Sequence, residues 1–179
     1  MGDRIGRVKE MEARLNRLLA WLDHQEGDIG EDVRALEGMP NCQSVDILQA
    51  YLRSEIPGET IRIRQRGREG NYVYFKTRKR RLEDGRRIEM EERLTKNEYL
   101  ELLMQADPDY RPIRKQRFCL SENGLYYNID IYPQWKDTAL MEIELYSGEE
   151  EVRFPEGIRV IREVTGEKEY TNPSIARVR

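Results

Sequence analysis

Strict alternation of apolar and polar residues dominates the chain after Gln43. The segment Ile61-Arg62-Ile63-Arg64 is typical, because a period of two places one residue type on each face of a half-buried strand. Gly, Pro, Asn and Asp between such segments predict tight turns. We expect seven strands, at residues 45–52, 60–66, 72–78, 87–94, 114–120, 126–132 and 139–146. Strands joined mostly by hairpins predict an α+β fold with an antiparallel sheet.

Helical spacing occurs in four other places. Thr95 precedes Glu98 by three residues and predicts a capped helix over residues 95–105. A shorter helix is expected near Pro155, with Ile158 and Ile161 facing inward. At the start of the chain, apolar residues recur at steps of three and four, at Val8, Met11, Leu15, Leu18 and Leu22.

The N-terminal part is expected to be a separate segment. Its first helix is followed by a second short helical pattern over residues 28–36, which ends at a turn-rich boundary in residues 38–43. Residues 1–37 also resemble the opening helices of a small bacterial helical domain. We therefore expect an N-terminal helical segment at residues 1–40 and one further domain at residues 41–179.

Composition narrows the possible chemistry. The 179 residues include 31 basic and 34 acidic side chains, so the net charge is -3 and a basic footprint for nucleic acid is not expected. A single histidine, His24, excludes a His-rich zinc site, and Cys42 with Cys119 forms no disulfide framework. No apolar run predicts a signal peptide or membrane span, so we expect a cytoplasmic protein without a membrane partner. Carboxylates, lysines and arginines must carry any chemistry.

The polar faces of the predicted strands repeat like charges. Arg62 and Arg64 share one face of their strand, as do Glu142 and Glu144. Stacked like charges repel one another, so such rows are favourable where basic rows bind a polyanion and acidic rows bind a cation. Phosphoryl transfer needs this combination of fixed cations and a divalent ion. The alternative is a half-buried sheet whose polar side meets water.

The order of these motifs resembles the CYTH, or triphosphate tunnel metalloenzyme, superfamily over about residues 45–176. The matching segments are Gln49-Ala50-Tyr51-Leu52, Arg62-Ile63-Arg64, Tyr74-Phe75-Lys76, Arg87-Ile88-Glu89-Met90-Glu91, Lys115-Gln116-Arg117-Phe118, Asp130, Glu142-Ile143-Glu144-Leu145, Glu163-Val164-Thr165-Gly166 and Lys168-Glu169-Tyr170-Thr171-Asn172.

The resemblance implies an antiparallel β-barrel of about eight strands with flanking helices and a charged tunnel. It also implies hydrolysis of inorganic or organic triphosphates with Mg²⁺ or Mn²⁺, or cyclisation of ATP. Carried over by position, the phosphate-binding residues are Arg62, Arg64, Lys76, Arg87, Lys115, Arg117 and Lys168. The metal-site carboxylates are Asp130, Glu142 and Glu144, with Glu89 and Glu91 nearby.

The chain departs from the family at its first strand, which carries Glu-x-Glu-x-Lys. The formal match here is Glu10, Glu12 and Arg14, within the expected helix. A barrel without that strand would leave an unpaired edge that favours a homodimer. Three functions remain open at this point: a metal-dependent triphosphatase, a non-catalytic polyphosphate- or nucleotide-binding module, and a structural domain.

Overall fold

The computed structural model describes residues 17–23, 38–135, 138–155 and 158–178. These residues form two compact units, each considered by itself. The first unit contains residues 47–113 and 172–178, and the second contains the described residues of 14–46 and 114–171. Both are built on antiparallel strands, so the predicted α+β class with an antiparallel sheet is confirmed.

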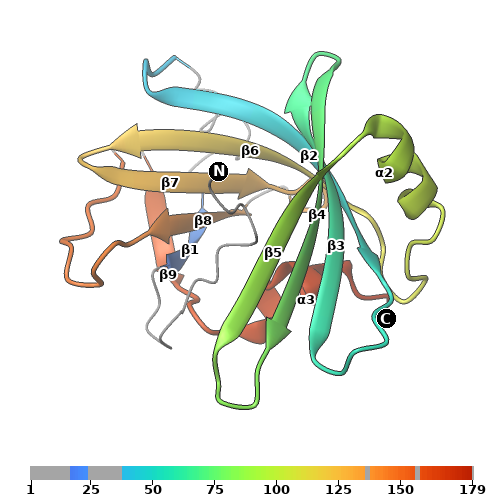
Figure 1. Ribbon diagram of the computed structural model, residues 1–179. Helices are drawn as coiled ribbons and strands as arrows, with labels where there is room; N and C mark the ends of the chain where they lie inside the picture. The colour runs from blue at the N-terminus through green and yellow to red at the C-terminus, as the bar shows by residue number, and fades with distance from the viewer. Residues whose placement is uncertain (1–16, 24–37, 136–137, 156–157, 179) are drawn as a thin grey trace, which may run out of the picture. The chain divides into compact units, whose positions relative to one another are not determined.

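The first unit is a four-stranded antiparallel arrangement beside a helix (Figure 1). Its strand order is β5-β4-β3-β2, with β3 at Glu59–Arg68, β4 at Asn71–Arg81 and β5 at Arg87–Leu94. Strand β2 spans Cys42–Leu52, and its residues from Ile47 onward belong to this unit. Helix α2, Lys96–Leu103, follows β5 directly and contacts β3, β4 and β5. The short helix α3, Asn172–Ala176, ends the unit.

Helix α2 begins where its capping residues predict. The Thr95 hydroxyl accepts a hydrogen bond from the Glu98 amide, and the Glu98 carboxylate accepts one from the Thr95 amide at 2.7 Å. Its buried residue, Tyr99, packs with Ala50 and Ile63 in the core of this unit. The Tyr99 ring lies 4.9 Å from that of Tyr74. The helix thereby covers the apolar face of β3 and β4.

The second unit carries the remaining strands in the order β6-β7-β8-β1-β9. These are β6 at Ile113–Glu122, β7 at Leu125–Ile131, β8 at Thr138–Glu144, β1 at Arg17–Asp23 and β9 at Arg159–Glu163. A 3₁₀ turn, η1, follows at Lys168–Tyr170. The core comes from one face of the first three strands: Phe118, Leu120, Leu125, Tyr127, Ile129, Ala139, Met141 and Ile143.

All seven strands expected after residue 43 are present, but two helical expectations are corrected. Residues 17–23, the end of the predicted N-terminal helix, form β1, which pairs with β8 and β9. Its continuous apolar run suits a strand between two neighbours, where pairing outweighs helical spacing. Residues 159–163, expected in a helix near Pro155, form β9, and Ile161 is exposed. The second helical pattern, over residues 28–36, lies outside the described residues.

The rest of the expected N-terminal segment lies mostly outside the described residues, so the boundary at residue 40 stays a prediction. In the described parts of the chain, no helix has the length and apolar character needed to cross a membrane.

Candidate functional site

The polar face of the second unit lies on β6, β7 and β8. Arg117 pairs with Asp130 across β6 and β7, and Asn128 pairs with Glu142 across β7 and β8. Directly paired residues of antiparallel strands share a face. The face therefore includes Lys115, Arg117, Asn128, Asp130, Glu142 and Glu144, as the alternation predicts for its charged members, together with the less polar Cys119, Tyr126 and Leu140.

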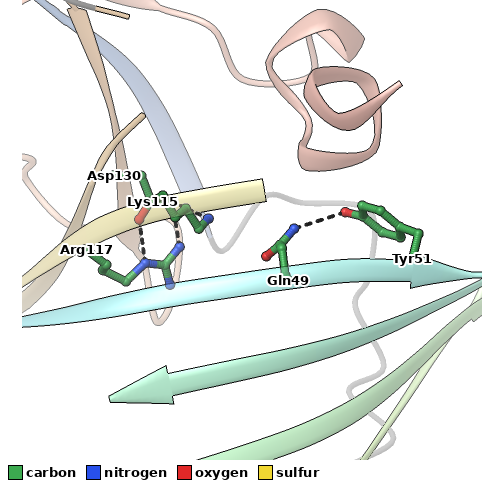
Figure 2. A network of polar contacts seen from close by, with 5 residues as sticks. All are labelled: Gln49, Tyr51, Lys115, Arg117 and Asp130. Atoms are coloured by element: carbon green, nitrogen blue, oxygen red, sulfur yellow. Dashed lines mark hydrogen bonds and ion pairs between the residues drawn. The ribbon is translucent and has the colours of Figure 1, made fainter. Parts of the chain in front are cut away.

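On this face, Lys115 and Arg117 both form ion pairs with the buried carboxylate of Asp130 (Figure 2). Lys115 Nζ lies 2.7 Å from Asp130 Oδ2, and Arg117 Nε donates to Asp130 Oδ1 at 2.6 Å. A second Arg117 nitrogen donates to Asp130 Oδ2 at 2.7 Å, which makes the arginine contact bidentate. The Lys115 and Asp130 side chains are 2% and 8% exposed. The cluster is thus largely removed from water.

Burial and pairing act in opposite directions on the pKa values of this cluster. Burial alone raises the pKa of Asp130, but the Lys115 charge and the Arg117 hydrogen bonds outweigh it and hold that pKa below its ordinary value. Burial alone lowers the pKa of Arg117, but its hydrogen bonds to Asp130 and the charges of Asp130 and Glu142 raise it. Asp130 and Arg117 therefore stay ionised across the neutral range.

Of the predicted metal ligands on this face, Asp130 contacts cations, whereas Glu142 and Glu144 lie on the neighbouring part of β8. Both oxygens of Asp130 accept hydrogen bonds from cations, so the carboxylate orients Lys115 and Arg117. Glu142 and Glu144 lie two residues apart on the same face of β8. Among the described residues, no group of three or more His, Cys, Asp or Glu side chains is arranged to hold a metal. Two carboxylates fit an ion such as Mg²⁺ that is shared with substrate phosphates.

Strand β1 lies beside these carboxylates. Its register places Leu19 opposite Glu142 and Arg17 opposite Glu144, so neither position supplies a further carboxylate. The formal match to the family's first-strand motif, Glu10, Glu12 and Arg14, lies outside the described residues.

The first unit has a polar face of its own on β3, β4 and β5. Arg62 pairs with Thr77, which in turn pairs with Glu91. The Thr77 hydroxyl donates to Glu91 at 2.9 Å, and Arg64 reaches the same carboxylate at 3.3 Å. One residue pair further along, Lys79 and Glu89 form an ion pair at 3.2 Å. The predicted residues Arg62, Arg64, Glu89 and Glu91 therefore do lie together.

Three other predicted phosphate-binding residues do not join this group. Lys76 pairs with Ile63 and so lies on the face opposite Arg62 and Arg64, where it forms an ion pair with Glu92 at 3.4 Å. Arg87 lies on the polar face but at the exposed start of β5. Lys168 is exposed in η1, on none of the strands.

Several polar residues near these faces had no predicted role. Lys79 occupies the position on the polar face that was expected of Lys76, and the strand register is what identifies it. The ring of Tyr132 lies 5.5 Å from Lys115 Nζ, a cation–π contact. In the first unit, the Gln49 amide donates to the Tyr51 hydroxyl at 3.3 Å (Figure 2). Burial raises the pKa of Tyr51 to about 12, against the opposing charge of Arg62.

No protein-family model matches the chain, and no curated protein matches it significantly. Solved structures do match. The hypothetical protein NE1496 is 21% identical, with a TM-score of 0.56 over 89% of this chain and 95% of that chain. A structure described as the inorganic triphosphatase NE1496 is 20% identical, with a TM-score of 0.56 over 89% of this chain and 92% of that chain. Similarity at this level establishes a shared fold.

Proposed function

We propose that this protein binds a triphosphate-containing small molecule and hydrolyses its terminal phosphoanhydride bond with Mg²⁺ or Mn²⁺. The observation that carries the proposal is the polar face of the second unit. It has Lys115 and Arg117 on β6, and Glu142 and Glu144 on β8. Phosphoryl transfer needs fixed positive charge at the phosphate oxygens and a site for a divalent ion. The fold shared with a solved inorganic triphosphatase supports the same conclusion.

Lys115 and Arg117 are assigned to the phosphate oxygens. With Asp130 between them, the cluster has two positive charges and one negative charge, so a net charge of +1 remains for an anion. Asp130 acts as a positioning residue, because its two oxygens fix both cations before any ligand binds. Preorganised charge of this kind does not have to reorient when charge develops during the reaction.

Glu142 and Glu144 are assigned to the divalent ion. Carboxylate oxygens are the ligands that Mg²⁺ and Mn²⁺ prefer, and one or two of them suffice when phosphates complete the coordination. When bound, the ion would neutralise charge on the phosphate oxygens. Arg62 and Arg64, on the polar face of the first unit, remain candidate anion-binding residues.

The test is phosphate release from tripolyphosphate with Mg²⁺ or Mn²⁺. We expect a Glu142→Gln, Glu144→Gln double variant to lose about 100-fold or more in turnover, because the ion loses both charged ligands. The matched control is Glu149→Gln, which removes an exposed carboxylate from the turn after β8 and should leave turnover unchanged. A double variant as active as the parent would refute the proposal.

A second candidate function is binding of a triphosphate without hydrolysis. The register of β1 favours it, because Leu19 and Arg17 occupy the positions opposite Glu142 and Glu144. Titration calorimetry with tripolyphosphate separates the two functions. Tight binding without phosphate release identifies the binding module, whereas binding with release identifies the hydrolase.

A further inference from the structure

The β4–β5 hairpin concentrates positive charge in a chain that is acidic overall. Between Arg78 and Glu89 the sequence has six basic and three acidic side chains, a local net charge of +3 against -3 for the whole chain. The segment spans the end of β4, the turn and the start of β5. Such a concentration on one hairpin points to an anionic ligand.

Two arginines at the base of this hairpin face each other directly. Arg81 pairs with Arg87 in the β4–β5 register, and both are exposed. Like charges in directly opposite positions are destabilising. Neither arginine forms an ion pair or hydrogen bond with any side chain in the part of the chain that the structure describes. No side chain in the described part of the chain therefore offsets the repulsion between them.

Two of the three carboxylates in this hairpin form ion pairs with other cations. Glu89, the next acidic residue on this face, forms an ion pair with Lys79 at 3.2 Å. Asp84, in the turn, forms an ion pair with Arg86, in which Arg86 Nε lies 2.6 Å from Asp84 Oδ2. The turn itself is closed by a hydrogen bond from the Leu82 amide to the Arg86 carbonyl at 2.7 Å. The hairpin thus presents the two guanidinium groups from an ordered backbone.

The arginine pair continues the polar face that contains Arg62. Thr77, the partner of Arg62, and Arg81 lie on the same side of β4, four residues apart. At the rise of a β-strand this separation is about 13 Å. Lys79 lies between the two levels, so cations extend along the whole face.

We propose that Arg81 and Arg87 form a second anion-binding position, which binds phosphate groups of a linear polyphosphate chain and lies on the same face as the candidate anion-binding residue Arg62. The inference rests on the proposed function, because it extends the same ligand class from triphosphate to longer phosphoanhydride chains. Guanidinium groups suit this role because each can bind phosphate oxygens through two parallel hydrogen bonds. Two facing guanidinium groups match a ligand with repeated negative charges.

The test is titration calorimetry at constant ionic strength, with tripolyphosphate and with a long linear polyphosphate. For the parent protein we expect a lower dissociation constant for the long chain than for tripolyphosphate, with the concentration of the long chain counted in chain ends. Arg81→Gln should weaken long-chain binding about three- to tenfold and leave tripolyphosphate binding unchanged. The matched control is Arg80→Gln, which removes the same charge from the opposite face of β4, where Arg80 pairs with Ile88.

The outcomes separate this inference from the proposed function. It is overturned if the parent binds both ligands equally, if Arg81→Gln weakens both equally, or if Arg80→Gln matches Arg81→Gln. Absence of tripolyphosphate binding in the parent refutes the proposed function instead. In that case, long-chain binding that depends on Arg81 but not on Arg80 still supports the anion position.

Discussion

The buried cluster around Asp130 supports a quantitative prediction for Asp130→Asn. Removing one member of a buried ion pair costs about 3–5 kcal/mol, because the remaining charge is left uncompensated in a medium that solvates it poorly. Here two cations, Lys115 and Arg117, lose their common partner. The asparagine amide offers one acceptor oxygen, but its nitrogen would face a cation. We therefore expect the free energy of unfolding to fall by about 3–5 kcal/mol.

The loss should depend on pH in a defined direction. The pKa of Asp130 is depressed in the folded protein, so the unfolded state binds the proton more readily. The stability that the ionised carboxylate contributes is therefore full above the unfolded pKa of about 3.9 and is lost as the pH falls through the folded pKa. The difference between parent and variant should be constant near neutrality and narrow below about pH 4.

Urea unfolding, followed by circular dichroism at several pH values, measures both effects. Asp109→Asn is the matched control, because that aspartate is exposed and should change the free energy of unfolding by less than about 0.5 kcal/mol. If Asp130→Asn cost less than about 1 kcal/mol at neutral pH, the cluster would not hold the cations as described. A difference that stayed constant on acidification would contradict the assigned pKa direction.

Three further stability predictions follow from local geometry. Thr95→Ala should cost about 1 kcal/mol in thermal unfolding because it removes the hydroxyl of the α2 capping box, and an unchanged melting temperature would contradict this role. A Cβ at Gly67 would lie 1.9 Å from the Asn71 carbonyl oxygen, so Gly67→Ala should cost about 2–4 kcal/mol. Gly70→Ala, which meets open space at φ +85°, should cost only about 1 kcal/mol, and equal losses would refute the steric argument. Gln49→Leu removes a buried carbonyl oxygen with no hydrogen-bond partner among the described residues, but also the amide that donates to the Tyr51 hydroxyl. The two effects oppose each other, so chemical denaturation should show a loss of less than about 1 kcal/mol; a loss above about 2 kcal/mol would mean that this oxygen is satisfied.

The sequence was a good guide to the strands and a weaker guide to the elements at the edges. The seven predicted strands and the Thr95-capped helix are recovered because alternation and capping are local properties. Residues 17–23 show why local pattern can fail. Their apolar spacing also fits a helix, and pairing with β8 on one side and β9 on the other makes them a strand.

For the candidate site too, the sequence predicted the arrangement within each strand but not the arrangement between strands. Alternation alone indicated that Arg62 shares a face with Arg64, that Lys115 shares one with Arg117, and that Glu142 shares one with Glu144. It could not relate one strand to the next, because a shift of one residue in register moves every side chain to the other face. The register shows that Lys79, and not Lys76, lies with Arg62.

By itself, therefore, the sequence determined the antiparallel strands, the position of α2 and the sorting of charge within each strand. These properties depend on residues two to four positions apart. Only the tertiary structure decided which rows of charge share a face, and that Asp130 orients Lys115 and Arg117 with both of its oxygens. The physical reason is that strand pairing brings together residues far apart in the chain, and no local pattern specifies those distances.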